Sequence, residues 1–153
     1  KNWPKQPMLR PNSAGECKGM ATYQWDGALS VGNQNIDDDH KVLIDTVGRL
    51  HEAMRTGQSK EVVGAILDDL VRSTEEHFER EEGFMLKINY VDYLPHKAEH
   101  ERLLREVRDL QSRFNAGTIT ITVSVSNFLS DWLVKHILGL DKKLAATIAK
   151  ASA

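Results

Sequence analysis

The sequence predicts an all-α protein: an antiparallel, up-down-up-down four-helix bundle with an irregular N-terminal arm. Apolar residues recur at helical spacing in four long stretches, and short polar connections separate these stretches. Short connections make successive helices antiparallel neighbours, as in a bundle. In addition, five of the six histidines lie on the inward stripes of the same four stretches, which points to a site in the core.

Composition restricts the possibilities further. The 153 residues are enough for one domain with a substantial core and too few to expect two. A formal net charge of -2 with interspersed signs favours neither nucleic acid nor membrane as a partner. A single cysteine, Cys17, excludes an internal disulfide, and no signal-peptide pattern opens the chain, so we expect a reducing, cytoplasmic location. Because the chain does not begin with methionine, we expect either a piece of a longer protein or a native start at Met20.

The N-terminal part differs from the rest of the chain. Residues 1–24 carry prolines and glycines without periodicity, which predicts an extension or linker, and residues 25–153 are expected to form the bundle domain. The segment from Tyr23 to Asn35 is an irregular lead-in with enough apolar residues to pack against the bundle.

The first two helices are predicted at about Asp37 to Arg55 and about Lys60 to Leu86. Gly57 ends the first helix and Ser59 caps the second. The expected inward residues are Ile36, His40, Leu43, Val47, Leu50 and Met54 in the first helix, and Val63, Leu67, Leu70, Thr74, His77 and Glu81 in the second.

The third helix is predicted to contain Pro95 in its opening turn and to end near residues 115–117. Residues 118–126 alternate like a strand, but the chain offers no partner strand. We therefore expect an extended entry at about 118–121, with Thr122 or a neighbour capping the fourth helix. The inward residues are His96, His100, Leu103, Val107, Leu110 and Phe114 in the third helix, and Val125, Leu129, Trp132 and His136 in the fourth.

The histidines on these stripes suggest a metal site. Residues four apart on a helix lie roughly 40° apart on one face, so His77 with Glu81, and His96 with His100, reach the same interior point. A lone buried histidine is usually structural, but burying five imidazoles and two carboxylates without a metal would be costly. The set exceeds what one tetrahedral zinc needs and is about right for two six-coordinate ions that share bridges, with a vacancy left over.

Asp141 is the least regular member of this set. It follows His136 by five residues and would lie about 140° away around a regular helix, so it joins the site only if the helix unwinds or kinks. Gly139 lowers the cost of that distortion. His51, at the far end of the first helix, is expected to be structural or exposed.

Two known motifs are missing. The sequence has neither the Glu-x-x-His pairs of ferritin-like carboxylate sites nor the His-Glu-x-x-His motif of metalloproteases. A histidine-rich site with few carboxylates stabilises high-valent iron poorly. We therefore expect it to favour dioxygen binding over oxygenase chemistry.

The order His40, His77-x-x-x-Glu81, His96-x-x-x-His100, His136-x-x-x-x-Asp141 resembles the hemerythrin family, bacterial hemerythrins in particular. The flanking residues agree, among them Trp25, the run from Ile36 to His40, and the run from Asp131 to Ile137. The resemblance covers about Trp25 to Leu144 and leaves out the arm before Met20.

The resemblance implies a non-haem diiron centre, two iron ions joined by an oxo or hydroxo bridge, with Glu81 and Asp141 as further bridges. His96, His100 and His136 would hold one iron, and His40 and His77 the other, which keeps a position open for dioxygen. The implied function is reversible dioxygen binding for storage, delivery or scavenging, without enzymatic activity. The expected walls of the dioxygen pocket are Trp132, Leu133, Leu129, Ile44, Phe78 and Met85.

Two other functions remain open at this point. The chain could be an oxygen- or redox-sensing input domain of a larger signalling protein with an appended output domain. It could also be a diiron enzyme that reduces peroxide or nitric oxide, although no additional acid–base residue near the open position is evident. The sequence leaves the oligomeric state and the role of Cys17 undetermined.

Overall fold

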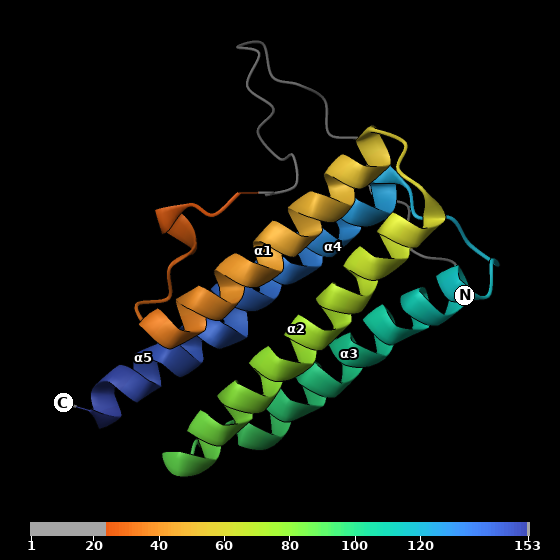
Figure 1. The fold of residues 1–153 in the computed structure, drawn as a ribbon. Coiled ribbons are helices and arrows are strands. Elements are labelled where there is room, and N and C mark those ends of the chain that lie inside the picture. The colour runs from red at the N-terminus through yellow and green to blue at the C-terminus, as the bar shows by residue number, and fades with distance from the viewer. Residues whose placement is uncertain (1–23, 153) are drawn as a thin grey trace.

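A computed structural model describes residues 24–152 and shows the predicted four-helix bundle (Figure 1). The N-terminal arm, with Cys17 and Met20, lies outside the described residues. A short 3-10 turn precedes the bundle. The elements are η1 (Gly27–Leu29), α1 (Gln34–Arg55), α2 (Lys60–Lys87), α3 (Tyr93–Asn115), α4 (Val123–His136), the π-helical segment η2 (Ile137–Asp141) and α5 (Lys142–Ala151). The fourth helical rod is continuous and consists of α4, η2 and α5, and it changes from α-helix to π-helix and back along its length.

Side-chain caps explain where the helices begin. The amide of Val125 donates to the Thr122 hydroxyl at 3.4 Å, which confirms the predicted cap of the fourth helix and ends the strand-like run. Ser59 caps α2 in the same way, as predicted. The first helix begins at Gln34 rather than at Asp37 because the Asn33 side chain accepts the Ile36 amide at 3.1 Å.

The inward stripes form the core. All the inward residues predicted for the second and third helices are buried, whereas Met54, Val125 and Trp132 are half-buried. Helix α1 packs on α2 and on α4, and α2 packs on α3. Between α3 and the fourth rod lies a groove of about 1260 Å³, whose lining includes Leu103, Trp132 and His136.

The lead-in packs against the bundle, as predicted. Leu29 and Val31 are buried in the main core, and Trp25 packs partly buried against it. The Asp37 carboxylate accepts the amide of Val31 at 2.8 Å and the hydroxyl of Ser30, which ties this segment to the first turn of α1. The lead-in thereby covers one end of the α1 stripe.

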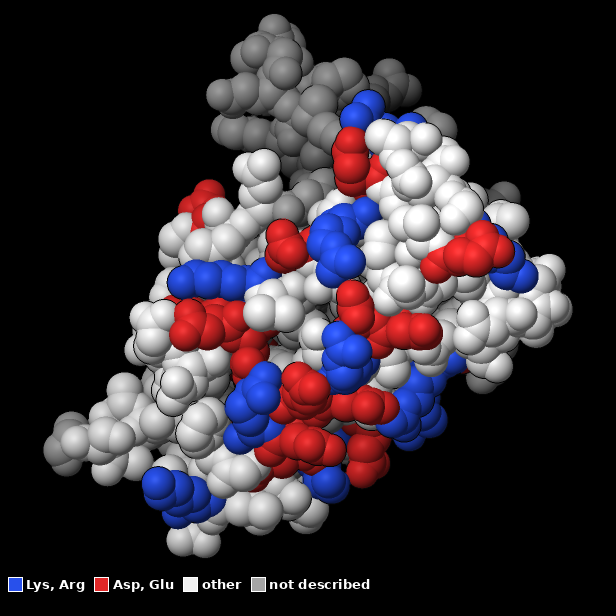
Figure 2. All heavy atoms as spheres, in the orientation of Figure 1, with Lys and Arg blue, Asp and Glu red and all other residues white. Residues whose placement is uncertain are grey.

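Charges of both signs are interspersed on the face seen in Figure 2. Several of them pair between helices, for example Arg49 with Asp69 at 3.4 Å and Arg108 with Glu75. Such exposed pairs contribute little stability each. Among the described residues, no helix is long and apolar enough to cross a membrane.

Candidate metal centre

The structure brings all seven predicted ligand residues together in the core, at the end of the bundle where the α2–α3 connection lies. They come from every rod of the bundle. None is more than 7% exposed, and the most exposed is His136. The residues are His40 on α1, His77 and Glu81 on α2, His96 and His100 on α3, His136 at the end of α4, and Asp141 at the end of η2.

These residues form two overlapping groups, in each of which the potential ligand atoms lie within 4.8 Å of one another. Both groups contain the two carboxylates, and they differ in their imidazoles. The first group is Glu81, His96, His100, His136 and Asp141, and the second is His40, His77, Glu81 and Asp141.

Asp141 reaches the core because the helix changes its winding before it. Residues Ile137–Asp141 form a π-helical turn, in which hydrogen bonds span five residues instead of four. A residue five positions on therefore returns to the same face, and Asp141 Oδ1 lies 2.9 Å from Nε2 of His136. The predicted departure from a regular helix is confirmed, and Gly139 lies within this turn.

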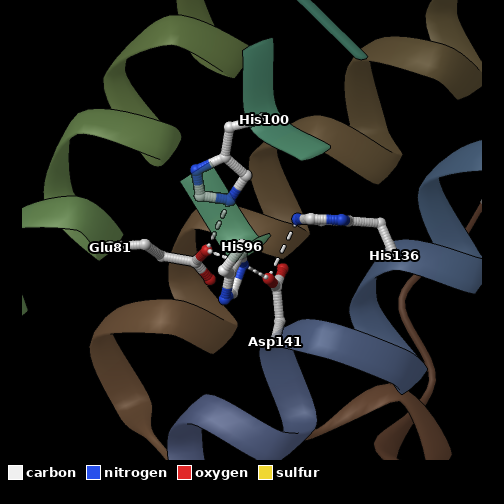
Figure 3. Close-up of side chains that lie close together, drawn as sticks. All are labelled: Glu81, His96, His100, His136 and Asp141. Atoms are coloured by element: carbon white, nitrogen blue, oxygen red, sulfur yellow. Dashed lines mark hydrogen bonds and ion pairs between the residues drawn. The ribbon is translucent and has the colours of Figure 1, made fainter. Parts of the chain in front are cut away.

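In the three-histidine group, shown in Figure 3, the polar ends of the side chains point at one another. Nε2 of His96 lies 3.2 Å from Asp141 Oδ1 and 3.3 Å from Glu81 Oε2. Nε2 of His100 lies 3.1 Å from the same Glu81 oxygen.

The imidazole nitrogens of the two-histidine group lie near the other oxygen of each of the same two carboxylates. His40 Nε2 lies 2.7 Å from Asp141 Oδ2, and His77 Nε2 lies 3.3 Å from both Asp141 Oδ2 and Glu81 Oε1. Each carboxylate thus directs one oxygen toward each group. This is the disposition that two bridging carboxylates require.

Several buried atoms of the cluster have no hydrogen-bond partner, and this tests whether a cation fits. His136 Nε2 and Glu81 Oε1 are both buried without one, although polar atoms lie 2.9 Å and 3.3 Å away, respectively. Buried polar groups without partners destabilise a fold. These two atoms lie close to polar neighbours without forming hydrogen bonds, as donor atoms do around a shared ion. The residues fit a pair of cations.

Burial and the neighbouring charges shift the pKa values of several histidines in the cluster. Burial lowers the pKa of His77, but the charge of Glu81 and hydrogen bonds to Asp141 and Asp39 outweigh it and raise the pKa to about 10. Burial is likewise outweighed at His96, whose pKa rises to about 9 because of Asp141 and Glu81. For His100 burial prevails and lowers the pKa. When no cation is bound, protons on His77 and His96 therefore offset the carboxylate charge.

The electrostatics of Asp141 follow the same pattern. Burial opposes its ionisation, but attraction to His136 and hydrogen bonds with His40 and His77 hold its pKa well below the usual value. Asp141 is therefore an anion at neutral pH and a competent metal ligand.

A carboxylate outside the cluster, which the sequence analysis did not identify, contacts the imidazole of His77. The Nδ1 atom of His77 lies 3.1 Å from Asp39 Oδ2, and Arg80 Nε donates to the same oxygen at 2.8 Å. Asp39 stands next to His40 in a run of three aspartates, and nothing in that run distinguishes it from its neighbours.

The predicted pocket-lining residues lie around the cluster to different degrees. Phe78 stacks on the His100 ring at 3.9 Å and meets His136 edge-on at 5.5 Å. Trp132 is half-buried and lines the groove beside His136. The other four are buried on helices that carry cluster residues. Leu133, Ile44 and Met85 lie within about one turn of a cluster residue, and Leu129 lies two turns before His136. Their role as dioxygen-pocket walls stays a prediction.

His51 stands apart from the cluster, as predicted. It is half-buried, and its Nδ1 lies 3.2 Å from the Ser126 hydroxyl. It belongs to neither group of potential ligands.

Fold and site together define a histidine-rich, cation-binding four-helix bundle. A family model described as the hemerythrin HHE cation binding domain matches residues 31–148. The chain belongs to the hemerythrin family. The buried cluster of histidines and carboxylates is consistent with a diiron site.

Individual relatives agree with this assignment. A bacteriohemerythrin of Methylococcus capsulatus is 40% identical over 124 residues, which are 80% of this chain and 94% of that protein. A myohemerythrin of Riftia pachyptila is 29% identical over 121 residues, 79% of this chain and 89% of that protein. The crystal structure of a wild-type hemerythrin matches with a TM-score of 0.77 at 36% identity, covering 82% of this chain and 96% of that chain.

Proposed function

We propose that this protein holds two iron ions in the buried cluster and binds dioxygen reversibly, without catalysing a reaction. The observation that carries the proposal is the asymmetry of the two ligand groups. One group offers three imidazoles and two carboxylates, whereas the other offers two imidazoles and the same carboxylates. If one oxo or hydroxo group also bridged the two ions, a six-coordinate pair would have one position free, on the ion with fewer imidazoles.

In this proposal, His96, His100 and His136 hold one ion, His40 and His77 hold the other, and Glu81 and Asp141 bridge them. Imidazole and carboxylate ligands suit iron. The chemistry that such a pair of ions supplies is the reversible transfer of two electrons to dioxygen. The protein belongs to a family whose relatives are named hemerythrin, bacteriohemerythrin and myohemerythrin. We propose residues 25–153 as the domain that carries this function, with residues 1–24 as an extension.

The residues around the cluster support reversible binding by excluding water. Ile44, Leu129 and Leu133 are at most 3% exposed, and Phe78 covers one face of His100. An apolar surround strengthens the electrostatic interactions inside it and keeps out water and the protons that it would bring. On the α3 side, the half-buried Trp132 lies beside His136 in the lining of the groove.

A visible-absorption experiment tests the proposal. The iron-loaded protein is reduced without air, exposed to air and then returned to vacuum. We expect a band that appears in air and fades under vacuum over repeated cycles. A spectrum that does not change in air, or that never reverts, would contradict reversible binding.

Two variants show that the band comes from the cluster. His77→Ala removes one of only two imidazoles in its group and should abolish the reversible band. His51→Ala serves as the control, because His51 is a histidine of the same bundle outside both groups. It should leave the band unchanged.

A further inference from the structure

We propose that Asp39 and Arg80 form a positioning pair that strengthens metal binding selectively at the two-histidine position. This inference rests on the proposed function, because it assumes that both ligand groups hold an ion. It assigns a task to two residues that touch no ion themselves and act through His77.

The contacts form a chain from the surface to the cluster. Arg80, whose side chain is 49% exposed, holds both oxygens of Asp39 with its guanidinium fork. Asp39 Oδ2 accepts the Nδ1–H of His77 at 3.1 Å. With the proton on Nδ1, the lone pair of His77 Nε2 faces the cluster, and the anionic acceptor makes that nitrogen a stronger donor.

The three-histidine group has a similar pair that stops short of its imidazole. Lys97 donates to Glu82 at 2.6 Å, but the nearest Glu82 oxygen lies 3.8 Å from His100 Nδ1, beyond hydrogen-bond distance. The carboxylates of Asp39 and Glu82 are almost equally exposed, at 14% and 16%. The difference between the two pairs is therefore the hydrogen bond to the histidine.

The remaining imidazoles also lack such support. Within residues 24–152, the Nδ1 atoms of His40, His96, His100 and His136 are buried without a hydrogen-bond partner. Of the five cluster histidines, His77 is thus the one backed by a carboxylate. His77 belongs to the group with only two imidazoles. Asp39 therefore strengthens a nitrogen ligand in the group that lacks a third imidazole.

Arg80 fixes the orientation of the acceptor. A guanidinium binds both carboxylate oxygens in one plane, which a lysine ammonium cannot do. Rotation of Asp39 would move Oδ2 away from His77 Nδ1. The pair therefore holds the plane of the His77 ring as well as its protonated nitrogen.

Stepwise titration of the metal-free protein with Co²⁺ tests the proposal, because calorimetry resolves the two affinities and the cobalt absorption bands report each ligand field. Asp39→Asn keeps the shape of the side chain and removes its charge. We expect one of two equivalents to bind about 10- to 100-fold more weakly, with altered bands, while the other is unchanged. Arg80→Met should weaken the same equivalent, and Arg80→Lys should restore only part of the loss.

Glu82→Gln is the matched control and should leave both affinities at their wild-type values. Thermal melting of the metal-free variants separates a folding defect from a defect at one position. If Asp39→Asn weakens both equivalents alike, or matches Glu82→Gln, the positioning role is wrong while the proposed metal centre stands. If the wild-type protein binds no cobalt in the cluster, the proposed function fails and this inference fails with it.

Discussion

Metal binding by this protein should become much tighter as the pH rises. At pH 7 the imidazoles of His77 and His96, with pKa values of about 10 and about 9, carry protons. Each must lose its proton to become a ligand. Below pH 9 the product of the two metal association constants should therefore rise by about two powers of ten per pH unit. At about 1.36 kcal/mol per proton and pH unit, the two protons change the binding free energy by roughly 2.7 kcal/mol per pH unit.

The metal-free fold should respond in the opposite direction. Both pKa values are raised above the ordinary 6.5. The stabilisation from these protonated imidazoles is therefore fully present below pH 6.5 and is lost as the pH rises through about 9 and 10. The melting temperature of the metal-free protein should fall between pH 7 and 9, and the gap to the metal-bound protein should widen.

Calorimetric titration with Co²⁺ in two buffers of different ionisation enthalpy measures the protons released. We expect about two protons per pair of ions at pH 7. His51→Gln should release the same number, because His51 lies outside the cluster. Release of fewer than about half a proton, or an affinity that does not depend on pH, would refute this reasoning.

Three further substitutions give separate tests. Asp141→Ala removes a carboxylate common to both groups, so metal analysis should show loss of both ions, and retention of two would contradict the shared role. Leu67→Ala in the fully buried core should cost about 2–5 kcal/mol in chemical denaturation, whereas Val91→Ala, at an 89% exposed position, should cost less than about 0.5 kcal/mol. Thr122→Ala should destabilise the fold by about 1 kcal/mol through loss of the α4 cap, and an equal effect of the neighbouring Ser124→Ala would argue against capping.

The bundle and the inward positions could be predicted because helical periodicity reports directly which face of each helix is buried. His77, Glu81, His96 and His100 continue the apolar stripes of their helices, so their shared direction followed from the stripes. Asp141 could be predicted only conditionally. Spacing showed that a regular helix would turn it away, but the form of the distortion, a π-helical turn, depends on packing of the whole rod.

The contacts around the cluster, such as the pair of Asp39 and Arg80, could not be predicted from the sequence, and the reason is physical. Asp39 and Arg80 are 41 residues apart on different helices, and their pairing depends on the register of α1 against α2. Periodicity specifies the direction of a side chain but neither that register nor the distance between helices. For the same reason the groove between α3 and the fourth rod, lined by Trp132 and His136, has no signal in the sequence.

The most direct test of the account is anomalous diffraction at the iron absorption edge from crystals of the iron-loaded protein. We expect two anomalous peaks inside the cluster, one beside the imidazoles of His96, His100 and His136 and the other beside those of His40 and His77, with Glu81 and Asp141 between them. A single peak, or peaks elsewhere in the bundle, would contradict the paired centre.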